Sequence, residues 1–253
     1  MLRHLIRANE GRIIFLVMDG LGGIRSKDFP KTALEAAKTP NLDRLAREGL
    51  CGRHMPVGMG ITPGSGPAHF SLFGYDPLAP ENDVGRGVVE VTGIGYELLD
   101  TDIAIRGNFA TVDAGGVLVD RRAGRIPHEE GVRICRKLQE AIPSIDDIET
   151  IVMPVREYRF GIVLRGHGLS HEVEETDPQM TGRKPLPPKP YRPKAEKTAE
   201  VLRKFVERAA ETLADEEKAN AVLLRGISRK PVITSFQEKF RLNPVAIASY
   251  PLY

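Results

Sequence analysis

The sequence predicts an α/β fold. Short apolar runs typical of strands alternate along the chain with segments whose apolar residues recur at helical spacing. A chain of 253 residues with 41% hydrophobic residues can bury a substantial core, as one large domain or two smaller ones. The 36 basic and 34 acidic residues nearly balance, so bulk charge argues against a nucleic-acid partner and any positively charged site must be local.

The first expected element is the apolar run 13–18, which has the form of a fully buried strand. Asp19 and a glycine-rich turn follow it, where open α/β sheets bind their ligands. Asp-Gly pairs are also common turn formers, which is the simpler interpretation of Asp19 alone. The run is too short to cross a bilayer, so no membrane partner is expected. Cys51 and Cys135 lack metal-ligand spacing, which predicts a reduced, cytoplasmic protein without disulfides.

The segment 39–49 predicts a short structural helix. Thr39 is the expected N-cap, Pro40 occupies the first helical position and Gly49 ends the helix. Its apolar residues, Leu42, Leu45 and Ala46, share one face.

The next segment, GITPGSGPAHFSLFGYDP at 60–77, surrounds Ser65 with glycines and prolines. Such a stretch is either a plain surface turn or a nucleophile loop whose glycines let the backbone approach a charged group. The apolar residues after Ser65 favour a short helix with Ser65 at or near its N-terminus. The helix dipole and unpaired N–H groups there favour an anion such as an alkoxide or a phosphate.

The pattern changes after the serine segment, where a second domain is expected to begin. Short strand-like runs with glycine breaks are expected over 83–113. A helix over 129–141, strands over 150–155 and 159–164, a long helix over 194–213 and a strand over 221–225 follow. The proline-rich stretch 177–194 is expected to be a lid or an exposed loop.

Arginines are frequent in this second part, near expected strands and turns. Most arginines in proteins are solvated, which is the simpler interpretation of any one of them. Guanidinium groups also bind carboxylate and phosphate in a bidentate manner, so a cluster predicts a small, doubly anionic substrate. The arginines in question are Arg106, Arg121, Arg122, Arg125, Arg156, Arg159, Arg165, Arg225 and Arg229.

Several blocks resemble those of the archaeal-type cofactor-independent phosphoglycerate mutases, a family of the alkaline phosphatase superfamily. They are VMDGLGG, TPNLDRLAREGLCGRHMPVG, TPGSGPAHFSLFGYDP, GRGVVEVTGIGYELLDTDIAIRGNFATVD, DRRAGR, EVEETDPQMTG and AIASYPLY, which together cover nearly the whole chain. The resemblance implies an alkaline-phosphatase-like metal-binding domain, made of residues 1–94 and 236–253, with a smaller α/β substrate domain inserted at 95–235. It also implies that a final strand, PVAIASY at 244–250, rejoins the first domain.

The resemblance also implies an activity, the interconversion of 3-phosphoglycerate and 2-phosphoglycerate through a phosphoserine intermediate in glycolysis and gluconeogenesis. Ser65 matches the nucleophile, and Asp19 and Ser65 match metal-binding positions for two divalent ions (Mn²⁺, Zn²⁺, Co²⁺ or Mg²⁺). His69 matches a histidine of the same block, expected to support the site or pack the helix rather than bind metal. The expected substrate contacts are Arg106, Asp120, Arg121, Arg159 and Arg225.

The chain departs from the family pattern in its metal ligands. The family's Asp-x-x-x-His pair, Asp-His pair and late His are expected beyond the block AIASYPLY, and no histidine here follows Asp with that spacing. His167 and His171 are four apart but lie in a glycine-containing segment that reads as a loop. We therefore expect weak or absent metal binding, impaired turnover by this chain alone, and an apolar face covered by a second chain or a second copy.

Two alternative functions stay open at this point. One is a metal-dependent phosphatase, or another phosphomutase, of the same superfamily. The other is a non-catalytic module that binds phosphoglycerate.

Overall fold

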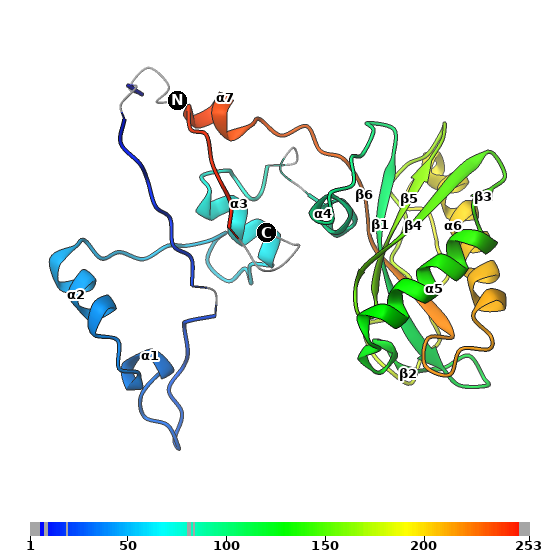
Figure 1. The fold of residues 1–253 in the computed structure, drawn as a ribbon, viewed down its shortest axis with the longest axis horizontal. Helices are drawn as coiled ribbons and strands as arrows, with labels where there is room; N and C mark the ends of the chain where they lie inside the picture. Colours follow the sequence, from blue (N-terminus) through cyan, green and yellow to red (C-terminus); the bar gives the residue numbers. More distant parts are fainter. Residues whose placement is uncertain (1–5, 8–9, 19, 80–81, 83, 248–253) are drawn as a thin grey trace.

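The computed structural model describes residues 6–7, 10–18, 20–79, 82 and 84–247 and contains a six-stranded antiparallel sheet, seen on the right in Figure 1. β1 (Ile103–Val112) lies between β5 (Arg159–Arg165) and β6 (Ala221–Arg229). β4 (Ile148–Arg156) and β3 (Ser144–Ile145) extend the sheet beyond β5, and β2 (Leu118–Asp120) pairs with the end of β1. The mixed α/β class is thus confirmed, and every pairing among these strands is antiparallel.

Two helices, α5 (His128–Ala141) and α6 (Glu196–Thr212), cover one face of the sheet. The main core lies between them and the sheet, and includes Phe109, Phe160 and Phe205. Phe109 and Phe160 stack with their ring centroids 4.4 Å apart. A Cβ on Gly107 would lie 2.3 Å from the Phe160 ring, so only glycine fits beneath this stack.

The opposite face carries α4 (Arg86–Gly93). Side chains alternate along β1, so that Ile103 and Ile105 enter the main core while Ala104 packs against Val88 and Val91 of α4. β1 therefore presents one apolar face and one face that α4 covers in part.

The remaining helices lie outside this sheet domain: α1 (Ala33–Ala36), α2 (Pro40–Glu48), α3 (Ser65–Leu72) and α7 (Phe236–Phe240) (Figure 1). Single 3₁₀ turns are formed by η3 (Ala123–Arg125) and η4 (Pro193–Ala195). Aromatic contacts join the segment before the sheet to the segment after it. Tyr75 packs against Phe240 with centroids 5.8 Å apart, and its hydroxyl donates to the carbonyl of Thr234 at 2.8 Å.

Most elements predicted from local patterns are confirmed. α2 begins at Pro40 after Thr39 and ends before Gly49, and α3 begins at Ser65. The helix expected over 129–141 is α5, that over 194–213 is α6, and the three later strands are β4, β5 and β6. Residues 177–192 form no helix or strand apart from an isolated bridge at Pro190.

The buried strand predicted over 13–18 is wrong in this structure. These residues are extended but belong to no strand, and Ile14 is 91% exposed. The physical reason is that an apolar strand is buried only between neighbouring strands, and among the described residues no strand pairs with this one. Asp19 lies outside the described residues.

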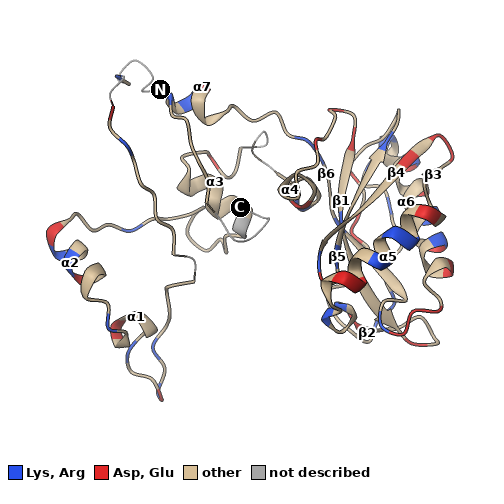
Figure 2. Ribbon diagram, viewed as in Figure 1, with Lys and Arg blue, Asp and Glu red and all other residues tan. Residues whose placement is uncertain are grey.

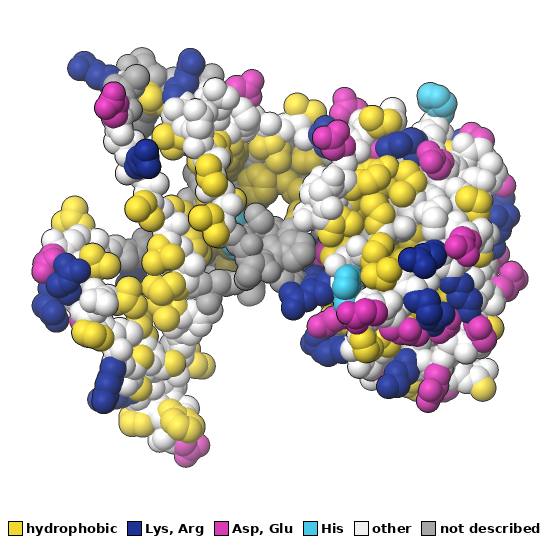
Figure 3. Space-filling view, in the orientation of Figure 1, with side chains coloured by type: hydrophobic (Ala, Val, Ile, Leu, Met, Phe, Trp, Pro, Cys, Tyr) yellow, Lys and Arg dark blue, Asp and Glu magenta, His cyan; other side chains and the backbone are white. Residues whose placement is uncertain are grey.

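Two further expectations also fail. The strand-like run expected before β1 is instead α4 over residues 86–93, because Val88 and Val91 lie on one helical face that packs on the sheet. The strand expected over 244–250 does not form in its described part, 244–247, where Ile247 is 98% exposed. Figure 3 shows how apolar side chains gather on the surface of the segments outside the sheet domain.

Within the described parts of the chain, no helix is both long enough and apolar enough to cross a bilayer.

The Gly107→Ala variant should be less stable than the wild-type chain by about 1–3 kcal/mol, because the added Cβ meets the Phe160 ring. Urea unfolding followed by circular dichroism measures the difference. Gly52→Ala is the control, since nothing lies within 4 Å of a Cβ at that position. Equal losses of stability in the two variants would contradict the tight fit at Gly107.

Candidate functional site

Three of the predicted arginines share the sheet face on which α4 lies. On β1, Arg106 stands directly opposite Arg225 of β6, and Asn108 stands directly opposite Arg159 of β5. Residues opposite one another in an antiparallel pair point to the same face. Because the side chains of Ile105 and Phe109 fill the main core, the arginines between and beside them must point the other way.

A carboxylate from α4 lies between two of these arginines. Glu90 is 2% exposed, and its Oε1 lies 3.3 Å from Nη1 of Arg106 and 3.2 Å from Nη1 of Arg159. Burial lowers the pKa of Arg106; Glu90 opposes this, and the charges of Arg159 and Arg225 lower the pKa further. Several positive charges therefore lie close together on this face, and the carboxylate of Glu90 offsets the repulsion between Arg106 and Arg159.

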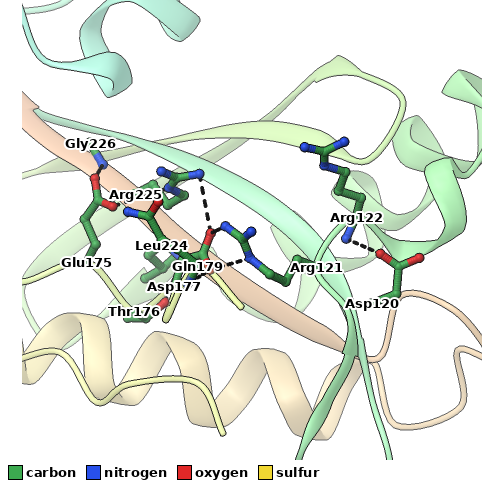
Figure 4. A network of polar contacts seen from close by, with 10 residues as sticks. All are labelled: Asp120, Arg121, Arg122, Glu175, Thr176, Asp177, Gln179, Leu224, Arg225 and Gly226. Atoms are coloured by element: carbon green, nitrogen blue, oxygen red, sulfur yellow. Dashed lines mark hydrogen bonds and ion pairs between the residues drawn. The ribbon is translucent and has the colours of Figure 1, made fainter. Parts of the chain in front are cut away.

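A second carboxylate, Asp177, joins two more arginines (Figure 4). Its buried side chain accepts hydrogen bonds from Nε and Nη2 of Arg121 at 2.8 and 2.6 Å, and lies 3.4 Å from Nη1 of Arg225. Burial acts to raise the pKa of Asp177, but hydrogen bonds from Arg121 and from the Gln179 N–H outweigh it and leave the pKa below its ordinary value. The pair in turn raises the pKa of Arg121.

The segment that carries Asp177 runs alongside β6. The Leu224 N–H donates to Oγ1 of Thr176 at 2.8 Å, and the Thr176 N–H donates to the Leu224 carbonyl at 2.9 Å. Glu175 accepts from the Gly226 N–H at 2.9 Å and from Nε of Arg225 at 3.3 Å. These bonds bring Arg106, Arg121, Arg159 and Arg225 into one group, which we call the arginine face.

The arginine face has spare hydrogen-bonding capacity. Among the described residues, the buried Nε of Arg106 and the buried Oδ1 of Asn108 have no hydrogen-bond partner. Four guanidinium groups here face three carboxylates, those of Glu90, Glu175 and Asp177. A small anion that also carries a hydroxyl donor would supply what both atoms lack.

The carboxylate of Asp120 lies in the turn after β2 and bonds to backbone N–H groups there. It accepts from the Arg122 N–H at 2.7 Å and from the Gly124 N–H at 2.8 Å, which closes the turn that leads into η3. Its expected contact with substrate therefore stays a prediction. In Figure 4 it points away from the Arg225 and Asp177 contacts.

The other arginines singled out by the sequence serve separate contacts. Arg165 pairs with Asp102 at 2.8 Å, Arg229 donates to the Leu169 carbonyl at 2.7 Å, and Arg125 lies 3.6 Å from Glu157. Figure 2 shows acidic and basic residues interleaved over the sheet domain, which fits the nearly neutral composition.

Ser65 is the first residue of α3, and Gly64 precedes it as the N-cap. α3 lies outside the sheet domain, so Ser65 and the arginine face are apart in this structure (Figure 1). His69 lies on α3 with its ring 6.1 Å from that of Phe73, which fits the expected packing role.

The described residues contain no group of three or more His, Cys, Asp and Glu side chains that could hold a metal ion. Divalent ions in proteins usually need three or four protein donors. Metal binding by Asp19 and Ser65 therefore stays a prediction, because Asp19 lies outside the described residues and nothing is described of the Ser65 side chain.

Comparison with known proteins assigns the family. The model of 2,3-bisphosphoglycerate-independent phosphoglycerate mutase matches residues 46–219. The chain belongs to this family. The matched part of this mutase-family chain contains Ser65, Glu90, Arg106 and Arg159, while Arg225 lies just beyond it.

Relatives extend the match over the rest of the chain. A probable 2,3-bisphosphoglycerate-independent phosphoglycerate mutase of Aquifex aeolicus is 51% identical, over 99% of this chain and 62% of the relative. One of Thermus thermophilus is 48% identical over 100% of this chain. The solved cofactor-independent phosphoglycerate mutase of Thermoplasma acidophilum is 33% identical, with a TM-score of 0.59 over 93% of this chain and 65% of that one. The chain spans 62% of the length of the curated relatives.

Sequence reasoning missed the carboxylates of the arginine face. A strand over 86–93 would not place Glu90 beside the arginines in this way. The spacing of Val88 and Val91, three residues apart, is the local signal for the helix that does. Asp177 lies in the block EVEETDPQMTG, but no local pattern there marks it as a partner of a distant arginine. Asn108, although next to Arg106 on the same strand face, was also passed over.

The stability of the chain should fall in acid because of Asp177. The native pKa of this group lies below its ordinary value of 3.8, so its contribution is present above that value and is lost as the pH falls through the native pKa. We expect the free energy of unfolding to decrease as the pH is lowered from about 4. Urea unfolding at a series of pH values measures this.

The Asp177→Asn variant should be less stable at pH 7 by about 1–3 kcal/mol, because Arg121 and Arg225 lose a charged acceptor. In this variant the free energy of unfolding should also decrease less as the pH is lowered. The exposed Asp100→Asn variant is the control. An unchanged pH profile in Asp177→Asn would contradict the assignment.

Proposed function

We propose that this chain binds phosphoglycerate on the arginine face and takes part in the interconversion of 3-phosphoglycerate and 2-phosphoglycerate through a phosphoserine at Ser65. Two observations support the proposal. The chain belongs to a family named for this reaction. Four arginines, from β1, β5, β6 and the residue after β2, gather on one sheet face.

The arrangement of the arginine face carries the proposal furthest. Phosphoglycerate has a carboxylate and a phosphate, and guanidinium groups bind both with charge-assisted hydrogen bonds. Arg106 and Arg225 stand on neighbouring strands, so one small dianion can contact both. The partner carboxylates hold these groups in fixed positions before the ligand arrives, which lowers the ordering cost of binding.

The proposed reaction moves one phosphoryl group twice. The Ser65 hydroxyl loses its proton as its oxygen forms a bond to phosphorus, while the bond to the glycerate oxygen breaks and that glycerate oxygen takes up a proton. The bound glycerate then presents its other hydroxyl, which loses its proton as it attacks the phosphoserine, and the released Ser65 oxygen takes up a proton. The N-terminus of α3, with Ser65 as its first residue, favours the negative charge on the phosphoserine.

The arginine face would keep glycerate bound between the two transfers. Its carboxylate stays anionic throughout, so the guanidinium groups can hold it while the hydroxyls exchange roles. For either transfer, the part of the chain that carries Ser65 has to close on this face. Closure of this kind excludes water and so favours transfer to glycerate over hydrolysis.

We assign no step to a metal ion, because the described residues do not supply a ligand set for one. Dependence on two divalent ions is an expectation from the family resemblance. Loss of turnover in the presence of a chelator, restored by added Mn²⁺, is its test.

A second candidate function is binding of phosphoglycerate without turnover. The observation that favours it is that the arginine face is built entirely by residues 90–225, with no contribution from the segment that carries Ser65. Binding of 3-phosphoglycerate by the wild-type chain without any turnover in added Mn²⁺ would point to this function.

Ser65→Ala should abolish conversion of 3-phosphoglycerate to 2-phosphoglycerate while 3-phosphoglycerate still binds, because the nucleophile and the arginine face are separate. The measurement is turnover with added Mn²⁺, together with calorimetric binding. Turnover above the Ser65→Ala blank supports the mutase. Binding without turnover supports the second candidate, and release of inorganic phosphate without isomerisation supports a phosphatase. Absence of binding overturns all three.

Arg106→Lys should weaken 3-phosphoglycerate binding about tenfold, because lysine keeps the charge but loses the planar pair of donors. Titration calorimetry measures the affinity. Arg208→Lys is the matched control, since Arg208 lies on α6 at the opposite face and donates to the Ser144 carbonyl at 3.2 Å. Equal affinities in the wild type and Arg106→Lys would remove Arg106 from the proposed site.

A further inference from the structure

One carboxylate oxygen serves two arginines of the arginine face. Oε1 of Glu90 lies 3.3 Å from Nη1 of Arg106 and 3.2 Å from Nη1 of Arg159. These arginines come from neighbouring strands, and Glu90 comes from a helix that covers both. The side chain of Glu90 is almost fully buried, so it is not a solvated surface charge that meets them by chance.

Close backbone contacts fix the helix that carries Glu90. A Cβ on Gly87 would lie 2.2 Å from the carbonyl oxygen of Ala104, so the helix approaches β1 as closely as glycine allows. Gly226, with φ of +56°, lets β6 pass Arg86 equally closely. The Val88 N–H also donates to Oγ of Ser228 at 3.2 Å. α4 thus cannot shift on the sheet without breaking these contacts, and Glu90 stays where it is.

The charges around Glu90 show what it does there. Arg106 lies opposite Arg225 and shares an oxygen of Glu90 with Arg159, so these close guanidinium groups repel one another, and the charges of Arg159 and Arg225 lower the pKa of Arg106. The negative charge of Glu90 raises the pKa of Arg106 and so opposes this repulsion. Without it, the repulsion between Arg106 and Arg159 would lose the opposite charge that lies between them, so the two flexible side chains would move apart.

Sharing also leaves donors for a ligand. Glu90 contacts Nη1 of each arginine, and Nε of Arg106 has no hydrogen-bond partner among the described residues. A bidentate pair would occupy two donors along one edge of a guanidinium, as Asp177 does with Nε and Nη2 of Arg121. Glu90 instead neutralises part of the charge of both arginines through one Nη1 each and does not occupy the Nε of Arg106.

We propose that Glu90 is a positioning residue, which holds Arg106 and Arg159 side by side so that their remaining N–H groups match the anionic groups of phosphoglycerate. This inference rests on the proposed function of the arginine face. It adds a specific role for α4, whose sequence carries no basic residue near the site besides Arg86. Glu90 acts through the arginines and makes no contact with the reacting atoms.

The test is the ratio of two affinities in the Glu90→Gln variant of the 253-residue chain. Binding of 3-phosphoglycerate should weaken about tenfold, because the spacing of two charge-assisted contacts is lost. Binding of inorganic sulfate should not weaken, because the variant gains one net positive charge and sulfate needs no fixed spacing. A destabilised fold would weaken both together, so the ratio separates positioning from a purely structural role.

A second variant separates position from charge. Glu90→Asp keeps the negative charge but is one methylene shorter, so it cannot reach both arginines from a helix that cannot move closer. It should lose 3-phosphoglycerate affinity as Glu90→Gln does. Glu97→Gln, an exposed carboxylate beyond the end of α4, is the control with the same charge change. Thermal unfolding of each variant shows that it is folded at the assay temperature.

The outcomes distinguish this inference from the proposed function. If the wild-type chain binds both ligands, two results overturn the positioning role alone. One is an unchanged ratio of the 3-phosphoglycerate and sulfate affinities in Glu90→Gln, and the other is wild-type 3-phosphoglycerate affinity in Glu90→Asp. No 3-phosphoglycerate binding by the wild-type chain overturns the proposed function. In that case phenylglyoxal labelling still tests Glu90: faster modification of Arg106 and Arg159 in Glu90→Gln supports the positioning role, and an unchanged rate overturns it.

Discussion

The structure depends above all on the pairing of β1 with a strand on each side. β5 and β6 satisfy its backbone groups along both edges, so β1 has a fixed register with each neighbour. Because side chains alternate along a strand, this single register sends Phe109 into the core and Arg106 to the opposite face. A shift by one residue would bury the arginines among the phenylalanines, which the cost of an unpaired buried charge forbids.

The arginine face exists because its charges are compensated by elements that come from elsewhere in the chain. α4 supplies Glu90, and the irregular segment after β5 supplies Glu175 and Asp177. Buried ion pairs of this kind are seldom a source of stability, since desolvation offsets the attraction. Their value here is geometric: they hold long, flexible side chains at fixed places, which is what recognition of a small dianion requires.

The predictions from sequence succeeded where local patterns decide the structure. Pro40 and Gly49 mark the ends of α2, and the small residues before Ser65 let α3 begin there, because helix termini depend on neighbouring residues. The run 13–18 has the composition of a buried strand but no paired neighbour, so its composition alone could not decide its environment. Residues 86–93 show the reverse case: their valines favour a strand, but tight packing of the segment on the sheet favours a helix.

The sequence by itself determined the family resemblance, the order of most elements from α5 to β6, the start of the helix at Ser65 and the abundance of arginine. Only the tertiary structure decided which arginines meet and which carboxylates hold them. Glu90 and Arg159 are 69 residues apart in the chain, and Arg121 and Asp177 are 56 apart. No local pattern encodes such contacts, because they follow from the register of strands and from how closely glycine lets α4 approach the sheet.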